Sequence, residues 1–151
     1  MPARIIDHRF NPWQSLAAHE TTLSAGSFGG CANFVGSMRD FNAGDKVSQM
    51  TLEHYPAMTQ QYLDALCADA ISQWSLVDGL IVHRVGLITP GESIVLTATW
   101  AAHREAAFAA CRYMMEELKS NAPFWKKEIT GSGERWVHDA PTTSEPPTES
   151  K

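Results

Sequence analysis

The sequence predicts an α+β domain in which helices pack on a mostly antiparallel or mixed sheet. Segments rich in β-branched residues alternate with two long amphipathic helical patterns. Pro, Gly and Asn residues mark turns between neighbouring strand patterns. The resulting order, β-α-β-β-α-β-β-α-β-β, points to this fold class. With 151 residues, 44% of them hydrophobic, the chain can bury a core of its own as one domain.

The chain is expected to begin with a short strand and a helix. Residues 4–10 form the strand pattern, and residues 11–20 form the helical pattern. Asn11 is the expected N-cap, and Pro12 occupies the first helical position, where a missing N–H leaves no helical bond unmade. Residues 21–30 are predicted to be a loop.

Residues 31–38 and 46–55 are both predicted to be strands because of their small, β-branched or alternating apolar residues. The segment "RDFNAGD" around their connection holds Asn, Gly and Asp residues that favour turns. We therefore expect the two strands to pair antiparallel with each other and to display Arg39 at their loop.

Two long helices are predicted from apolar residues at three- and four-residue steps. The first opens at Pro56 and runs to about Trp74, and the second runs from about His103 to Lys119. Pro123 ends the second helix, because the residue before a proline is pushed out of the α region. The apolar face of the first helix comprises Met58, Tyr62, Leu63, Leu66, Ala70, Ile71 and Trp74. That of the second comprises Ala107, Phe108, Cys111, Met114, Met115 and Leu118.

Residues 79–88 and 93–100 are predicted to be strands joined by a turn with Pro90 and Gly91. The second of these strands is apolar enough to supply an interface between copies of the chain.

The C-terminal part is expected to hold a hairpin and a tail. Residues 124–137 contain two strand patterns around a "GSGE" turn. The single domain is therefore predicted to span residues 1–138. Residues 139–151 are rich in Pro, Ser, Thr and acidic residues, which predicts a disordered tail.

The charge balance argues against a general nucleic-acid binder. The formal net charge is −5, from 12 basic and 17 acidic side chains, and it becomes −3 without the three carboxylates and one lysine of residues 139–151. Such a molecule repels a polyanion, so anion recognition requires a local basic pocket. This favours a small anionic ligand over DNA or RNA.

Three widely spaced cysteines, Cys31, Cys67 and Cys111, indicate neither a disulfide framework nor a zinc site. Cys67 and Cys111 fall on apolar helix faces, where buried and inert thiols occur. This usage suits a reducing cytoplasm, and no segment approaches the ~20 apolar residues of a membrane span. His54 and His83 are expected to be structural, because no metal-ligand spacing such as H-x-x-x-H is present.

Basic residues at the start of the second long helix are candidates for anion binding. His103 and Arg104 lie where the helix macrodipole favours negative charge, so a bound phosphate would stabilise Arg104. Pairing of Arg104 with an acid such as Glu105 or Glu53 is the alternative. Arg39 likewise either closes a ligand pocket or pairs with a neighbouring aspartate.

Lys119, Lys126 and Lys127 gather within nine positions around the end of that helix. Alternation along the following strand places Lys126 with Glu128 on one face and Lys127 on the other. Only one of the adjacent lysines can therefore join Lys119 after the chain reverses. Two neighbouring ammonium groups lower each other's proton affinity, which makes a lysine useful as a base or nucleophile. A solvated, charged hairpin is the alternative interpretation.

The chain contains, in this order, "FVGSMRDFNAGDKVSQMTLEHYPAM", "VHRVGLITPGE", "AAHREAAFAACRYMMEELKSNAPFWKKE" and "RWV". Together these segments closely resemble the large, catalytic subunit of molybdopterin synthase over residues 28–137. The resemblance implies an α/β hammerhead fold with an additional antiparallel sheet. It also implies a heterotetramer, in which a homodimer of this subunit is flanked by two small ubiquitin-like subunits.

The reaction implied by the resemblance is a sulfur transfer. Two sulfur atoms pass from the C-terminal Gly-Gly thiocarboxylate of the small subunit to cyclic pyranopterin monophosphate, which becomes the dithiolene molybdopterin. Neither a metal nor a further cofactor is implied. Lys119 and Lys126 would be the catalytic lysines, with Lys119 nearer the thiocarboxylate carbon. The substrate-binding residues implied by the matching motifs are Ser37, Met38, Arg39, His103, Arg104, Lys119, Lys126, Lys127 and Glu128.

Two other functions are open at this point. A non-enzymatic module would hold a phosphorylated ligand or a partner's tail in the same pocket without chemistry. A thiol-dependent transferase would use Cys31.

Overall fold

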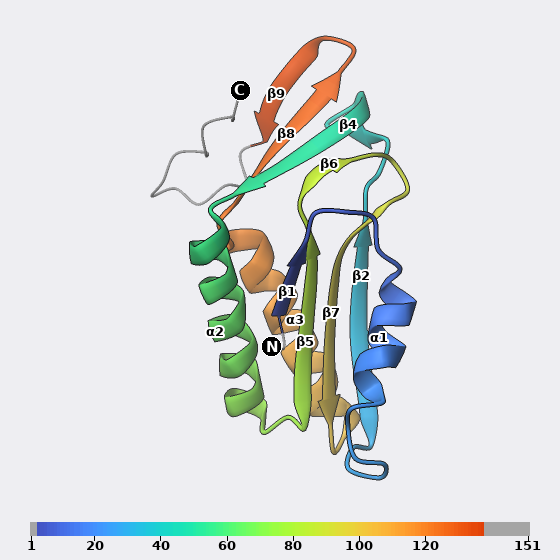
Figure 1. Ribbon diagram of the computed structural model, residues 1–151, viewed down its shortest axis with the longest axis vertical. Coiled ribbons are helices and arrows are strands. Elements are labelled where there is room, and N and C mark those ends of the chain that lie inside the picture. Colours follow the sequence, from blue (N-terminus) through green and yellow to red (C-terminus); the bar gives the residue numbers. More distant parts are fainter. Residues whose placement is uncertain (1–2, 138–151) are drawn as a thin grey trace.

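The computed structural model describes residues 3–137, which form three helices and nine strands in two sheets (Figure 1). The first sheet has the order β1 (Ala3–Ile6), β5 (Asp78–Arg84), β7 (Ser93–Ala101) and β2 (Gly30–Ser37). The second has the order β3 (Phe41–Asn42), β4 (Asp45–His54), β8 (Phe124–Thr130) and β9 (Gly133–Val137), and β6 (Gly86–Ile88) also pairs with β4. The predicted tail, residues 139–151, lies outside the described residues, as does the end of the predicted domain 1–138.

Helices cover both faces of the first sheet, which is antiparallel except for the parallel pair β1 and β5. On one face α2 (Pro56–Trp74) and α3 (Arg104–Asn121) bury a core that includes Leu63, Ile81 and Met114. On the other face α1 (Pro12–Glu20) and the loop after it cover a second cluster around Trp100. The molecule is thus an α+β domain, as predicted.

The second sheet is antiparallel and lies beyond one end of the first sheet, at the top of Figure 1. Its apolar side chains form a separate small core of Met38, Val47, Met50, Leu52 and Ile88, with Ile94 packed against it. The expected additional antiparallel sheet is therefore present. The C-terminal end of α3 lies near its junction with the first sheet (Figure 1).

Local sequence signals placed the helices correctly. The Asn11 side chain accepts hydrogen bonds from the backbone N–H groups of Trp13 and Gln14 at 3.0 and 3.3 Å, and Pro12 is the first helical residue. α2 has the predicted bounds, and α3 ends before Ala122, whose ψ of 138° is extended as expected before Pro123.

The predicted pairing of residues 31–38 with 46–55 is wrong. β2 pairs with β7 in the first sheet, whereas β4 belongs to the second. The turn-forming residues instead close a tight hairpin between β3 and β4, whose two central residues Ala43 and Gly44 have φ values of 52° and 83°. Positive φ at both central residues is typical of a two-residue hairpin loop. The chain therefore crosses between the sheets at Met38–Asp40 rather than folding back on β2.

Three smaller expectations also need correction. The single strand predicted over residues 79–88 is divided into β5 and β6, because Gly86 adopts a φ of 86° that turns the chain into the second sheet. Met58 and Phe108, predicted on buried helix faces, are 43% and 67% exposed. β7 lies between β5 and β2 and is largely buried within the chain, so it offers no interface to another copy.

Candidate active site

A pocket of about 140 Å³ opens where the second sheet meets the C-terminal end of α3. We call it the basic pocket, because three of its lining side chains are cationic and one is acidic. Its lining residues are Ser37, Met38, Arg39, Phe41, Asn42, Met50, Ile94, Lys119, Lys126 and Glu128. Six of the nine predicted site residues therefore line one pocket.

Lys119 and Lys126 reach this pocket from two different elements. Lys119 lies in the last turn of α3, and Lys126 lies near the start of β8. The chain reversal around Pro123 brings both side chains to the same pocket. One ligand in this pocket can therefore contact both side chains. Their catalytic roles stay a prediction.

Lys127 points away from the basic pocket, as strand alternation predicts. Its ammonium group lies 3.8 Å from a carboxylate oxygen of Glu134 and 5.5 Å from the centre of the Trp136 ring, both on β9. Any contribution of Lys127 to this pocket must therefore come through its backbone.

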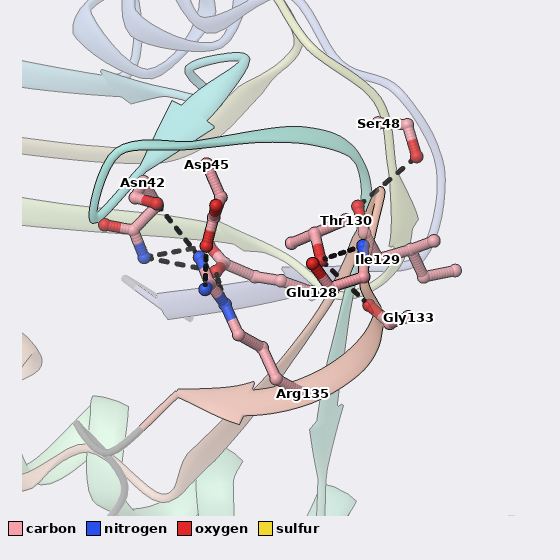
Figure 2. Close-up of polar contacts among 9 residues, drawn as sticks. Asn42, Asp45, Ser48, Glu128, Ile129, Thr130, Gly133 and Arg135 are labelled. Carbon is pink, nitrogen blue, oxygen red and sulfur yellow. Dashed lines mark hydrogen bonds and ion pairs between the residues drawn. The ribbon is translucent and has the colours of Figure 1, made fainter.

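The buried carboxylate of Glu128 belongs to a hydrogen-bond network that joins four strands, β3, β4, β8 and β9 (Figure 2). Its two oxygens each accept from the amide of Asn42 at 3.1 Å, and one accepts from Arg135 Nε at 3.2 Å. Arg135 also donates to Asp45 at 2.7 Å and to the Asn42 carbonyl at 2.9 Å. The hydrogen bonds to Asp45 and then Glu128 raise the pKa of Arg135 above its ordinary value. Glu128 is thus fixed in place as an acceptor on the pocket wall.

Sequence reasoning missed Asn42 and Arg135 as parts of the site. The signal for Arg135 was available in the hairpin itself. Because Thr130 pairs with Gly133 across the turn, Glu128 must pair with Arg135 two steps further along. Asn42 had no such signal, since it comes from β3, a two-residue strand.

Arg39 lies in the crossing between the two sheets, with its guanidinium carbon 4.9 Å from the centre of the Phe41 ring. Asp45, one of its candidate partners, pairs with Arg135 instead. Over residues 3–137 no ion pair joins Arg39 to a carboxylate. The observed placement therefore matches the pocket interpretation of Arg39 and leaves its charge available to an anion.

The crossing is fixed by backbone bonds to the turn between β6 and β7. The N–H of Met38 donates to the Glu92 carbonyl and the N–H of Gly91 donates to the Met38 carbonyl, both at 2.9 Å. The Glu92 side chain in turn forms a buried ion pair with Arg84 at 3.4 Å. Glu92 thus connects the ion pair to Met38, the residue before Arg39.

A second cavity of about 200 Å³ adjoins the basic pocket and shares Ile94, Lys119 and Lys126 with it. We call it the annex. Its other lining residues are Leu52, His83, Val95, Met115, Leu118 and Phe124. Most of these side chains are apolar, so the two lysines lie between a polar compartment and an apolar one.

His83, predicted to be structural, is buried and stacks on Phe124 with 4.0 Å between ring centres. Its Nδ1 lies 2.9 Å from the Arg84 carbonyl and must carry a proton to donate to it. Burial, ahead of the charges of His54 and Lys126, lowers the pKa of His83 to about 4. The ring is therefore neutral at neutral pH.

His103 and Arg104 are not brought to the basic pocket of their own chain. His103 is the N-cap of α3 and Arg104 its first residue, whereas Lys119 lies in the last turn. Lys119 lies fifteen positions after Arg104 along the helix, which corresponds to roughly 22 Å at 1.5 Å per residue. In the part of the chain that the structure describes, no ion pair joins Arg104 to Glu105 or Glu53 either.

The cysteines are poorly suited to act as nucleophiles. Burial, with a contribution from Glu20, raises the pKa of Cys31 to about 11. Burial raises the pKa of Cys67 to about 12, and it also raises that of Cys111. Both helix cysteines are buried, as predicted. Because the thiolate is the reactive form, the Cys31 hypothesis loses its physical basis.

Within residues 3–137, no group of three His, Cys, Asp or Glu side chains is arranged to hold a metal ion. None of the helices over the same residues is long and apolar enough to cross a membrane.

Comparisons with known proteins agree on one family. A family model described as "MoaE protein" matches residues 9–121. The chain is 49% identical to a molybdopterin synthase catalytic subunit of Ralstonia nicotianae over 86% of this chain and 74% of that one. It is 46% identical to the subunit of the same description from Pseudomonas aeruginosa, over 91% of this chain and 90% of the relative. A solved structure of a molybdopterin biosynthesis MoaE protein from Burkholderia ambifaria has a TM-score of 0.77 and 44% identity, covering 95% of this chain and 92% of its own.

Proposed function

Because the chain belongs to the MoaE family and is a sulfur-transferring molybdopterin synthase catalytic subunit of molybdenum cofactor biosynthesis, we propose how its site carries out the reaction. Two sulfur atoms pass from the C-terminal Gly-Gly thiocarboxylate of a small ubiquitin-like subunit to cyclic pyranopterin monophosphate. One observation carries the proposal: Lys119 and Lys126 line both the basic pocket and the annex. The two lysines therefore lie where two reactants can meet.

The basic pocket is the proposed site for the pyranopterin. Arg39, Lys119 and Lys126 supply positive charge for the cyclic phosphate. The fixed carboxylate of Glu128 can accept hydrogen bonds from ring N–H groups, and Ser37 and Met38 complete the wall.

The lysines are proposed to stabilise charge and to move protons. A thiocarboxylate sulfur attacks a carbon of the pyranopterin side chain that bears oxygen and forms a thioester to the partner's terminal glycine. The carbon–oxygen bond at that carbon breaks, and the oxygen leaves with protons as water or stays on the phosphate as the cyclic ester opens. Water then attacks the thioester carbonyl, the carbon–sulfur bond to the glycine breaks, and sulfur stays on the pterin while the tail leaves as a carboxylate. An ammonium group beside that carbonyl stabilises the oxyanion formed during hydrolysis and can donate a proton to the departing sulfur.

Reconstitution tests the reaction. The purified chain, a thiocarboxylated small subunit and the pyranopterin should together yield dithiolene product. Lys119→Ala should lower the rate by about 10²-fold or more, the usual effect of removing an oxyanion partner. Lys46→Ala, which removes an exposed lysine of β4 outside the pocket, is the matched control and should leave the rate unchanged. Normal turnover by Lys119→Ala would contradict the mechanism, and binding of both reactants to the wild type without product would favour a binding module.

His103 and Arg104 are proposed to serve the site of a second copy of the chain. Their distance from Lys119 along α3 excludes a shared pocket within one chain, so anion binding by Arg104 next to the lysines requires a dimer. Together with two small subunits, this gives the heterotetramer.

Mixed dimers test this arrangement. Lys119→Ala and Arg104→Ala chains are each expected to be inactive alone, but heterodimers of the two should contain one intact site. Random mixing should therefore restore about a quarter of wild-type activity. A mixture of Lys119→Ala with Lys126→Ala is the control: both lysines come from one chain, so no site is restored. Equal recovery in the two mixtures would contradict the shared site.

We further propose that the enzyme needs no metal or additional cofactor for this step, and that it works in the cytoplasm. Residues 1–138 are proposed as its domain and residues 139–151 as a tail.

A further inference from the structure

The annex has a composition that differs from that of the basic pocket beside it. Its walls are mostly apolar, from Leu52, Val95 and Leu118 among others, and His83 is the one lining side chain that is polar and uncharged in the described chain. A cavity of this kind suits a narrow, uncharged segment that has few hydrogen-bond donors to satisfy.

His83 offers an acceptor to that cavity. The ring is only 8% exposed and is held by stacking on Phe124 and by the bond from Nδ1 to the Arg84 carbonyl. With the proton on Nδ1, Nε2 of the neutral ring carries a lone pair. No protein group among residues 3–137 makes a hydrogen bond to this nitrogen. An acceptor fixed in a nearly buried ring and left unpaired indicates a ligand donor in the annex.

The two reactants of the proposed reaction differ in what they need. A pyranopterin has many ring donors and acceptors and a phosphate, which the annex cannot satisfy with one neutral acceptor. A polypeptide end made of two glycines has no side chains, is narrow, and offers peptide N–H groups. Its terminal thiocarboxylate would meet Lys119 and Lys126 at the boundary that the annex shares with the basic pocket.

We infer that His83 is a binding residue for the partner's tail: its Nε2 accepts a hydrogen bond from a peptide N–H of the C-terminal Gly-Gly while the tail lies in the annex. The inference rests on the proposed function, since it assigns one of the two reactants to the second cavity. It places the pterin and the tail on opposite sides of the two lysines.

A pair of substitutions separates the two ring nitrogens. In His83→Asn the amide can occupy the place of Nδ1 and still donate to the Arg84 carbonyl, but nothing replaces Nε2. In His83→Gln the amide oxygen can reach the place of Nε2 as an acceptor. The asparagine variant removes the proposed contact, and the glutamine variant is the matched control that restores it.

The assay is a binding cycle that involves no sulfur chemistry. The dissociation constant is measured by calorimetry for the small subunit with its ordinary Gly-Gly carboxylate and for the same subunit lacking the two glycines. Truncation should weaken binding to the wild type, and this effect should shrink about 3- to 10-fold in His83→Asn, the usual contribution of one hydrogen bond. In His83→Gln the truncation effect should stay within about twofold of the wild type.

Two outcomes would overturn the inference. The first is a truncation effect of the same size in the wild type and in His83→Asn. The second is a loss of pyranopterin affinity in His83→Asn with unchanged tail binding, which would place the pterin in the annex. If the asparagine variant does not fold, the ¹⁵N resonance of Nε2 in the wild type decides instead, because it should shift with the intact partner and not with the truncated one. A wild type that binds the tail through His83 but makes no dithiolene would refute the proposed function alone.

Discussion

Replacing Glu92 by glutamine should destabilise the fold through one buried charge. Arg84 and Glu92 lie 3.4 Å apart, and both side chains are 7% exposed. Arg84 also donates to the carbonyls of Val85 and, at 2.7 Å, Leu87. Glu92 accepts from the backbone N–H of Thr89 at 2.8 Å and from its hydroxyl at 3.1 Å. Glutamine can keep the bonds from Thr89 but leaves the guanidinium without a counter-charge.

The loss of stability in Glu92→Gln can be worked out from the interactions that Arg84 loses and those that it keeps. Breaking a buried ion pair by removing one partner costs about 3 to 5 kcal/mol. Since Arg84 retains two carbonyl acceptors, we expect about 2 to 4 kcal/mol for Glu92→Gln. For a domain of this size, that lowers Tm by roughly 5 to 15 °C. Glu116→Gln is the matched control, because the Arg112–Glu116 pair is 3.7 Å long and exposed; its effect should stay below about 0.5 kcal/mol.

The pH dependence gives an independent test of the same pair. Burial alone would raise the pKa of Glu92, but the hydrogen bonds from Thr89 and the charge of Arg84 together lower it below the ordinary value of 4.5. A carboxylate with a lowered folded-state pKa stabilises the fold above that ordinary value and loses this contribution as the pH falls through the folded-state pKa. Acid should therefore destabilise the wild type more than Glu92→Gln. Thermal unfolding at pH 7 and between pH 5 and 3 measures both effects. Equal Tm values for Glu92→Gln and Glu116→Gln at pH 7 would refute the reasoning.

Two further predictions concern residues outside the pocket. Ser75 ends α2 with a φ of 49° in the left-handed region. Ser75→Gly should therefore raise the free energy of unfolding, measured by chemical denaturation, by about 0.5 to 1 kcal/mol, whereas Ser75→Ala should not. A loss of stability in the glycine variant would count against the assigned backbone strain. Cys31→Ser should keep sulfur transfer within about twofold of the wild type, because a thiol whose pKa is raised to about 11 is not a nucleophile at neutral pH; loss of activity would revive the thiol hypothesis.

Local signals in the sequence predicted the helices and most strands, because caps, prolines and apolar periodicity act over a few residues. Asn11, Pro56 and Pro123 each mark a helix boundary that the structure confirms. Pairing between strands is a long-range property, and here the prediction failed. A turn signal at Asn42 to Asp45 shows that the chain turns there, but not that the partner strand is the two-residue β3 instead of β2.

The same division applies to the candidate site. Alternation along β8 was sufficient to separate Lys126 from Lys127, and the reversal at Pro123 was sufficient to bring Lys126 to Lys119. The annex could not be predicted, because it is formed where β4, β5, β7, α3 and β8 meet and these elements are brought together by long-range contacts. His83 illustrates the limit. A structural role was expected for it, whereas the nitrogen that faces a cavity depends on which ring atom donates to the Arg84 carbonyl.

The charges of the basic pocket match those of the two proposed reactants. Arg39, Lys119 and Lys126 against Glu128 leave a formal charge of +2 among the lining residues, as three cations less one carboxylate. A cyclic phosphate diester carries one negative charge and a thiocarboxylate carries another, so both must be present before the pocket is neutralised. Each reactant bound alone leaves one positive charge that attracts the other. Because Asn42 and Arg135 donate hydrogen bonds to Glu128, the protein itself holds this carboxylate in place. The charge balance that favours joint binding is therefore set by side chains of the second sheet, of α3 and of the crossing between the sheets.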